Sequence, residues 1–203
     1  PIPNDLMPEL GFKAHCRRLL WTQNELPRIL KKAWSPLLLS PLPEAPLLKG
    51  IRSVVLAHDL IPIRYPQLSP VFAYYLTYVP LVLHNSEKVL CNSEATAREI
   101  HSRLAVPARK LLTIPLGFDS SNLRPLNITR KPIFLILGRH NPHKNIPKVL
   151  EALSHIKNKD IELWIVGPRD VRYTPSLKVK ADELGISMRC KWIFWVFYSN
   201  TKE

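Results

Sequence analysis

The chain has 203 residues, of which 46% are hydrophobic and 22% charged, an ordinary composition for a soluble globular protein. Its 29 Lys and Arg outnumber its 16 Asp and Glu, and the formal net charge of +13 favours anionic partners: nucleotides, nucleic acid or an acidic membrane. The longest apolar stretch, Val71 to Leu83, has about 13 residues and is too short to span a bilayer, which takes about 20.

Prolines interrupt the first fifty residues, at Pro36, Pro41, Pro43 and Pro46, so we expect only short regular structure there. Apolar runs rich in β-branched residues follow and are expected to form strands. These runs are Ser53–Ala57, Lys88–Cys91, Lys110–Ile114, Ile133–Leu137, Ile161–Val166 and Lys191–Val196. Most of them lack the alternation of a half-exposed strand, which is typical of strands covered on both faces in a parallel sheet.

Helical patterns lie between several of these runs, at Glu94–Leu104, Ile146–Ile156 and Leu177–Leu184. Ser93 is suited to cap the first of them, and Gly185 is suited to end the third. The alternation of strands and helices predicts an α/β fold with doubly wound parallel sheets.

The segment from Pro115 to Pro132 is rich in turn-forming residues and has no hydrophobic periodicity. We expect it to join two α/β units. The N-terminal unit would then span residues 1–116, the linker 117–131 and the C-terminal unit 132–203.

Ligands of open α/β sheets bind beyond the carboxyl ends of the strands, so the polar residues at those ends are the first candidates for a site. The ends that stand out are AHDLIP (57–62), CNSEAT (91–96), PLGFD (115–119), LGRHNPHKN (137–145) and, more weakly, IVGPRD (165–170).

The stretch LGRHNPHKN combines a glycine with cationic side chains. Gly138 would let backbone approach a ligand, Arg139 offers a planar fork for phosphate oxygens, and Lys144 offers a point charge. A helix beginning near Asn145 would add free N–H groups and the positive end of its dipole. The pattern fits an anion site, most plausibly for a diphosphate. A solvated basic loop explains the same residues and stays open here.

His58 and Asp59 end a strand and allow two interpretations. They form a polar pair that reaches into a cleft, or His58 is a satisfied core histidine and Asp59 caps the following turn. The histidines have no recognisable metal-ligand spacing. Three cysteines at wide spacings, Cys16, Cys91 and Cys190, imply no disulfide framework and no CxxC metal pair, and Cys91 fits a small core residue in a reducing cytosol.

Five stretches together resemble glycosyltransferase family 4, whose members have the GT-B fold and use nucleotide sugars. In chain order they are VVLAHDLIPIRYP, VLCNSEATAREI, LLTIPLGFD, FLILGRHNPHKNIPKVLEAL and LWIVGPRD, and they lie between residues 54 and 170. Upstream, WTQNELPRIL (21–30) is similar to the corresponding segment of bacterial members.

The resemblance implies two Rossmann-like lobes with parallel sheets, the acceptor mostly on the first lobe and the donor mostly on the second. It implies a retaining transfer from a nucleoside-diphosphate sugar to a glycan or lipid-linked acceptor, with no cofactor and no metal. It assigns catalytic roles to His58, Arg139 and Lys144 and an acceptor-side position to Asp59. Donor binding would involve Gly138, Arg139, Lys144, Asn145 and Gly167.

Two family features have no counterpart in the sequence: the glycine-bearing loop after the family's first strand, and the late Glu–seven residues–Glu motif. We therefore expect both lobes to be partial and the chain to be a truncated enzyme with little activity. The alternatives are a non-catalytic remnant that keeps part of the diphosphate site, and a basic nucleic-acid-binding protein, although no motif of such a protein is present. The cysteines favour the cytoplasm, and the clustering of the candidate residues at strand ends argues against nucleic acid as a partner. The charge is compatible with peripheral contact with an anionic membrane.

Overall fold

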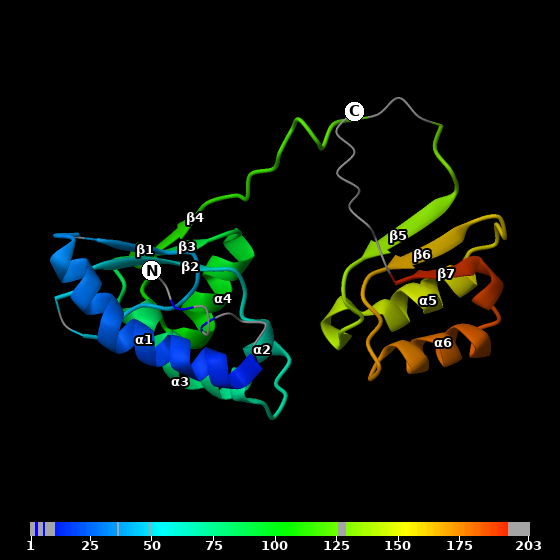
Figure 1. The fold of residues 1–203 in the computed structure, drawn as a ribbon. Coiled ribbons are helices and arrows are strands. Elements are labelled where there is room, and N and C mark those ends of the chain that lie inside the picture. Colours follow the sequence, from blue (N-terminus) through cyan, green and yellow to red (C-terminus); the bar gives the residue numbers. More distant parts are fainter. Residues whose placement is uncertain are drawn as a thin grey trace. The chain divides into compact units, whose positions relative to one another are not determined.

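The computed structural model describes residues 3, 6, 11–35, 37–48, 50–125 and 129–194 (Figure 1). The chain divides into two compact units, Pro1–Leu123 and Arg124–Glu203. Each unit contains its own sheet of parallel strands with helices packed on it, so the expected α/β class is confirmed. The division falls within the segment 117–131 of the sequence.

The sheet of the N-terminal unit has the strand order β1 (Leu38–Ser40), β2 (Ser53–Ala57), β3 (Lys88–Cys91) and β4 (Leu111–Thr113). Its helices are α1 (Gly11–Lys32), α2 (Ile61–Arg64), α3 (Pro70–Asn85) and α4 (Glu94–Leu104), with a 3-10 turn at Ala108–Lys110. All described strand pairs are parallel, so the carboxyl ends of β2 and β3 meet at one edge of the sheet.

The core of this unit lies between one face of the sheet and the helices α3 and α4. Alternate residues of β2 and β3, among them Val55 and Val89, pack with Val79 and Leu83 of α3 and with Ile100 of α4. Cys91 is fully buried in the same cluster, as the sequence predicted.

The helices α1 and α3 and the short α2 were not anticipated, and the expectation of short structure in the first fifty residues is wrong. The helix α1 has 22 residues and contains Pro27, whereas the interrupting prolines that motivated the expectation follow its end. The helix α3 corresponds to the apolar stretch that was considered only as a membrane span. It begins with Pro70, where a missing N–H costs nothing, and Ser69 caps it by accepting a hydrogen bond from the N–H of Phe72 at 3.2 Å.

The sheet of the C-terminal unit has the strand order β5 (Ile133–Leu137), β6 (Glu162–Val166) and β7 (Cys190–Ile193). The helices α5 (Ile146–His155) and α6 (Thr174–Glu183) pack on one face of it, and 3-10 turns span Pro142–Lys144 (η4) and Ser187–Arg189. The described part of the expected strand Lys191–Val196 lies in or directly after β7, and its last two residues lie outside the described residues.

Local signals set the ends of two helices as expected. The hydroxyl of Ser93 accepts a hydrogen bond from the N–H of Thr96 at 3.1 Å and caps α4. After α6, Gly185 has a φ of +65°, and the N–H of Ile186 donates to the carbonyl of Ala181 at 3.0 Å, which closes the helix end.

Candidate active site

The carboxyl ends of the three strands of the C-terminal unit meet in a close backbone contact. The N–H of Gly138 donates to the carbonyl of Val166, and the N–H of Gly167 donates to the carbonyl of Ile193, both at 2.9 Å. A Cβ on Gly167 would lie 2.0 Å from the carbonyl oxygen of Gly138, closer than any side chain tolerates. Gly138 has a φ of +137°, a conformation that glycine adopts without strain. Both glycines are therefore required by the backbone at this edge.

Two cationic side chains flank this contact. Lys144 folds back over Gly138, since its Cε lies 3.7 Å from the position that a Cβ of Gly138 would take. Arg139 follows Gly138 directly and is exposed. Among the described residues, neither Arg139 nor Lys144 forms an ion pair. The structure thus brings Gly138 and Lys144 together, while the convergence of the two head groups on one anion stays a prediction.

The turn η4 leads from these residues into the amino end of α5. The N–H of Lys144 donates to the carbonyl of Asn141 at 2.9 Å, and Asn145 adopts a left-handed conformation with φ +51° at the junction. The side chain of Asn145 does not cap the helix. The first turn of α5 therefore keeps its electropositive end uncovered by its own cap residue, which favours a nearby anion.

His140 was given no role by the sequence, although it lies between Arg139 and Lys144. Its ring is 2% exposed, and its Nδ1 lies 2.8 Å from the hydroxyl of Thr174, the first residue of α6. Burial lowers the pKa of His140, and the carboxylate of Asp170 opposes that shift. The ring meets Trp192 edge to face, with centroids 5.7 Å apart. No local pattern could have shown this contact, because the two partners are 34 positions apart in sequence.

The loop after β6 carries a separate ion pair. Arg172 donates to Asp170 at 2.8 Å and lowers the pKa of that carboxyl group to about 2. The guanidinium of Arg172 also lies 4.9 Å from the ring centroid of Tyr173. Asp170 is therefore occupied and leaves Arg139 without a carboxylate from this loop.

In the N-terminal unit, His58 directly follows β2 and is exposed, so the interpretation as a core histidine is wrong. Its carbonyl accepts a hydrogen bond from the hydroxyl of Thr96 at 3.2 Å, which links the end of β2 to the first turn of α4. The carboxylate of Asp59 accepts a hydrogen bond from the N–H of Ile61 at 2.9 Å and caps the turn before α2. That His58 faces a cleft between the lobes stays a prediction.

The PLGFD stretch ends in a turn, as expected. Asp119 accepts hydrogen bonds from the N–H and hydroxyl of Ser121 and from the amide of Asn122, and these bonds lower the pKa of its carboxyl group. Gly117 has no positive φ, and no described atom lies within 4 Å of the position that a Cβ would take there, so neither backbone conformation nor space requires a glycine at this position.

A buried ion pair at the carboxyl end of β1 was also missed. Arg18 of α1 donates two hydrogen bonds to Glu44, at 2.8 and 2.9 Å, and the hydroxyl of Tyr74 donates to the same carboxylate at 3.2 Å. Glu44 is only 8% exposed. Burial, followed by the nearby charge of Glu44, raises the pKa of Tyr74. The pair fixes α1 to the loop after β1 and to α3.

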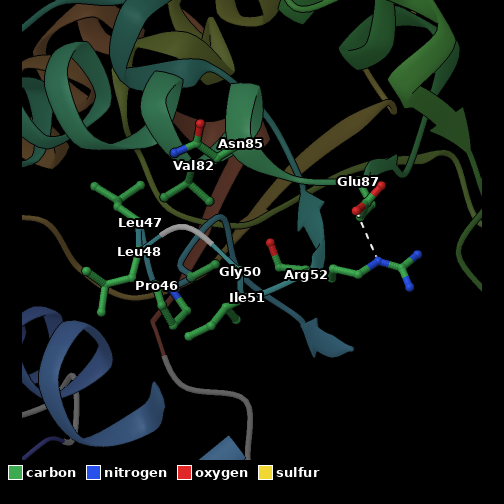
Figure 2. A pocket seen from close by; sticks show the side chains of 11 residues that line it. Pro46, Leu47, Leu48, Gly50, Ile51, Arg52, Val82, Asn85 and Glu87 are labelled. Atoms are coloured by element: carbon green, nitrogen blue, oxygen red, sulfur yellow. Dashed lines mark hydrogen bonds and ion pairs between the residues drawn. The ribbon is translucent and has the colours of Figure 1, made fainter. Parts of the chain in front are cut away.

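A pocket of about 470 Å³ lies at the other end of the strands in the N-terminal unit (Figure 2). Pro46, Ile51 and Val82 line it, and the ion pair between Arg52 and Glu87, at 3.1 Å, lies at one side. It adjoins the amino end of β2, and none of the residues expected to bind donor or acceptor lines it.

Comparison with known families identifies the family of the chain. The profile described as Glycosyltransferase Family 4 matches residues 5–122, more than half of the chain, and the profile described as Glycosyl transferases group 1 matches residues 120–203. The chain belongs to glycosyltransferase family 4. The resemblance carried by the five stretches is thereby confirmed, whereas no match was found among curated proteins.

Solved glycosyltransferases share the fold of this family 4 chain. A glycosyltransferase from Rickettsia africae aligns with a TM-score of 0.58 at 18% identity, covering 87% of this chain and 51% of its own. Anabaena HepE in complex with UDP and glucose aligns at 0.57 and 18% identity, covering 83% and 50%. WaaG, a glycosyltransferase involved in lipopolysaccharide biosynthesis, aligns at 0.56 and 12% identity, covering 84% and 51%. The chain spans about half the length of these structures.

Proposed function

We propose that this chain forms part of a retaining glycosyltransferase that transfers a sugar from a nucleoside-diphosphate sugar to a glycan or lipid-linked acceptor. The observation that carries the proposal is the position of Lys144 over Gly138 at the carboxyl end of β5. The UDP bound to HepE makes a nucleoside diphosphate the natural donor class to test. The retaining outcome rests on the family pattern.

In this proposal, Arg139 and Lys144 hold the diphosphate of the donor. As the glycosidic bond breaks, negative charge builds on the leaving nucleoside diphosphate. These two cations, which have no carboxylate partner among the described residues, would stabilise that charge more than they stabilise the intact donor, which is the requirement for catalysis. The positive end of the dipole of α5, next to Asn145, acts in the same direction, while Gly138 and Gly167 let the backbone approach the donor.

On the acceptor side, the exposed imidazole of His58 would contact the transferred sugar near the acceptor. The carboxylate of Asp59 already accepts the N–H of Ile61, so its contribution is to set the loop that presents His58. No metal or cofactor step enters the proposal, and among the described residues no three His, Cys, Asp or Glu side chains gather as a metal site.

Binding of UDP to the purified chain, measured by isothermal titration calorimetry, tests the donor site. A hydrogen bond to a charged group contributes about 1.5–3 kcal/mol, so Lys144→Ala should weaken UDP at least ~10-fold. The matched control is Lys159→Ala, which removes the same charge from the turn before β6, at the amino edge of the sheet. Equal affinity of the Lys144→Ala and unaltered chains for UDP would contradict the proposal.

Retention of the chain on DNA, measured with and without UDP, separates the proposal from nucleic-acid binding. Retention of the chain on DNA that depends strongly on salt and is not relieved by UDP would favour the nucleic-acid alternative, because neutralised phosphates release counterions. We expect UDP to slow hydrogen exchange of the amides in the loop 138–145 and DNA to leave their exchange unchanged.

We also propose peripheral contact of α1 with an anionic membrane surface. No described helix is long and apolar enough to cross a bilayer. Lys13, Leu20 and Lys31 are exposed and lie about two and three turns apart on one face of α1, and Trp34, just after the helix, is 92% exposed. Each Lys near an anionic surface contributes about 1 kcal/mol, so Lys13→Gln with Lys31→Gln should weaken binding to phosphatidylserine vesicles ~30-fold. Binding to phosphatidylcholine vesicles that equals binding to anionic ones would contradict this part.

A further inference from the structure

The side chain of His140 connects two loops that both begin at the carboxyl edge of the C-terminal sheet. It lies in the loop after β5, directly after Arg139, and its Nδ1 lies 2.8 Å from the hydroxyl of Thr174. That hydroxyl also accepts the N–H of Asp170 at 3.0 Å, in the loop after β6. Both His140 and Thr174 are 2% exposed. One buried hydroxyl therefore holds the backbone of both loops.

This contact bears directly on the cations of the loop. Arg139 is attached to the residue whose ring is buried, and Lys144 lies over Gly138, one residue before Arg139. Neither head group forms an ion pair among the described residues, so the positions of the two side chains depend on the backbone of the loop. A ring locked between Thr174 and Trp192 limits the movement of that backbone.

Packing alone explains only part of the choice of residue. The Nε2 atom of His140 is buried and has no hydrogen-bond partner among the described residues. An unpartnered buried polar atom is costly, and a phenylalanine would fill the space beside Trp192 without that cost. The hydroxyl oxygen of Thr174 would still accept the N–H of Asp170 and would lose only its contact with Nδ1. A histidine at this position is thus unfavourable for stability and is explained by the hydrogen bond that it makes with Thr174.

We propose that His140 is a positioning residue for the donor diphosphate: through its hydrogen bond with Thr174 it holds the loop that carries Arg139 and Lys144 in the binding arrangement. The proposal rests on the proposed function in taking a diphosphate as the ligand. His140 itself touches no substrate in this account, and it acts through the two cations beside it.

The test compares His140→Phe and Thr174→Val with Thr174→Ser, which keeps the hydroxyl. Two quantities are measured: the affinity for UDP by calorimetry, and hydrogen exchange of the amides of residues 139–145 without ligand. Loss of one buried hydrogen bond should weaken UDP ~3- to 10-fold in both variants. The rate of hydrogen exchange of the loop amides should rise by a similar factor. Thr174→Ser should keep both the affinity for UDP and the exchange rate of the unaltered chain. The double variant His140→Phe with Thr174→Val should lose no more than either single variant.

Stability separates positioning from a purely structural role. His140→Phe should leave the denaturation midpoint unchanged or raised while it weakens UDP. If His140→Phe and Thr174→Val bind UDP as the unaltered chain does and keep their loop exchange, the proposal is overturned. If the unaltered chain binds no UDP, the proposed function fails, and the exchange measurement still decides whether His140 and Thr174 hold the loop.

Discussion

Replacement of Gly167 with alanine tests whether the ends of β5 and β6 must touch. The new Cβ would lie 2.0 Å from the carbonyl oxygen of Gly138 and 2.8 Å from its carbonyl carbon, whereas ordinary contact begins at 3.4 Å. Both atoms belong to the backbone, so no rotation of a side chain relieves the overlap. The strand ends must separate by more than about 1 Å.

That separation strains or breaks the two hydrogen bonds at this edge, from Gly138 to Val166 and from Gly167 to Ile193, both 2.9 Å long. Overpacking costs about 1–3 kcal/mol, and a hydrogen bond contributes about 1 kcal/mol net. We therefore expect Gly167→Ala to lower the free energy of unfolding by about 3 kcal/mol. The displacement of Gly138 should also weaken the binding of UDP.

Urea denaturation followed by tryptophan fluorescence measures this effect, since Trp164 and Trp192 lie on β6 and β7. Gly117→Ala is the matched control, because that glycine has no positive φ and no neighbour near its Cβ position. We expect the control to be neutral or to gain about 0.4–1 kcal/mol from the loss of chain entropy in the unfolded state. A Gly167→Ala chain within about 0.5 kcal/mol of the unaltered one would refute the required contact.

Two further predictions concern buried cationic or titrating groups of the C-terminal unit. Arg189 is 9% exposed and donates to three carbonyls at 3.0–3.1 Å, those of Leu153, Asn158 and Ile161. Arg189→Leu should therefore cost about 3 kcal/mol in urea denaturation, while the exposed Arg169→Leu should cost nothing measurable. Burial lowers the pKa of His140, so the unfolded chain binds more protons and the free energy of unfolding should fall as the pH decreases from about 6.5. His140→Phe should remove that part of the pH dependence, and an unchanged slope would contradict the assignment.

The strands were predictable because each apolar run is short and is bounded by polar or turn-forming residues. The run Ser53–Ala57 forms β2 with the expected bounds, and Lys88–Cys91 and Ile133–Leu137 form β3 and β5 in the same way. The expectation that these strands are covered on both faces is wrong for β5, in which Phe134, Leu135 and Leu137 are 52–71% exposed. The apolar run predicted the strand, whereas its cover depends on neighbouring elements that the local sequence does not specify. The expected helix Leu177–Leu184 begins earlier, at Thr174, because that residue is held by contacts with His140 and Asp170.

The helices α1 and α3 were not predictable from the same kind of signal. The prolines taken as breaks, Pro36 to Pro46, follow α1, and two other prolines, Pro27 and Pro80, lie inside α1 and α3. Tertiary contacts outweigh their cost: Gln23 of α1 donates to the carbonyl of Ala45 at 3.1 Å and to the hydroxyl of Tyr78 at 2.9 Å. Helix propensity is a weak prior beside contacts of this kind, and the sequence near a proline does not contain them.

In the candidate site, the residue types were predictable from the sequence, whereas the contacts that hold them in place were not. Glycine and cations at a strand end were visible in LGRHNPHKN, because chemistry of this kind depends on the local sequence. The contact of Gly167 with Gly138 depends on the register of β5 against β6, in which Leu137 pairs with Val166. Register follows from the fold, so the reason for Gly167 appeared only with the sheet.

The distribution of charge in the C-terminal unit is compatible with the anion site that we propose in the loop after β5. Several carboxylates of this unit already have cationic partners: Glu151 pairs with Lys148 and Lys180, Glu162 with Lys191, and Asp170 with Arg172. The ion pairs lower the pKa values of the carboxyl groups of Glu151 and Asp170, and the hydrogen bond from the indole of Trp164, followed by that from Lys191, lowers the pKa of Glu162. Arg139 and Lys144 lie outside this network in the described part of the chain. A diphosphate bound as we propose would therefore meet two cations beside a glycine and a helix start, and would displace no carboxylate of the described residues to reach them.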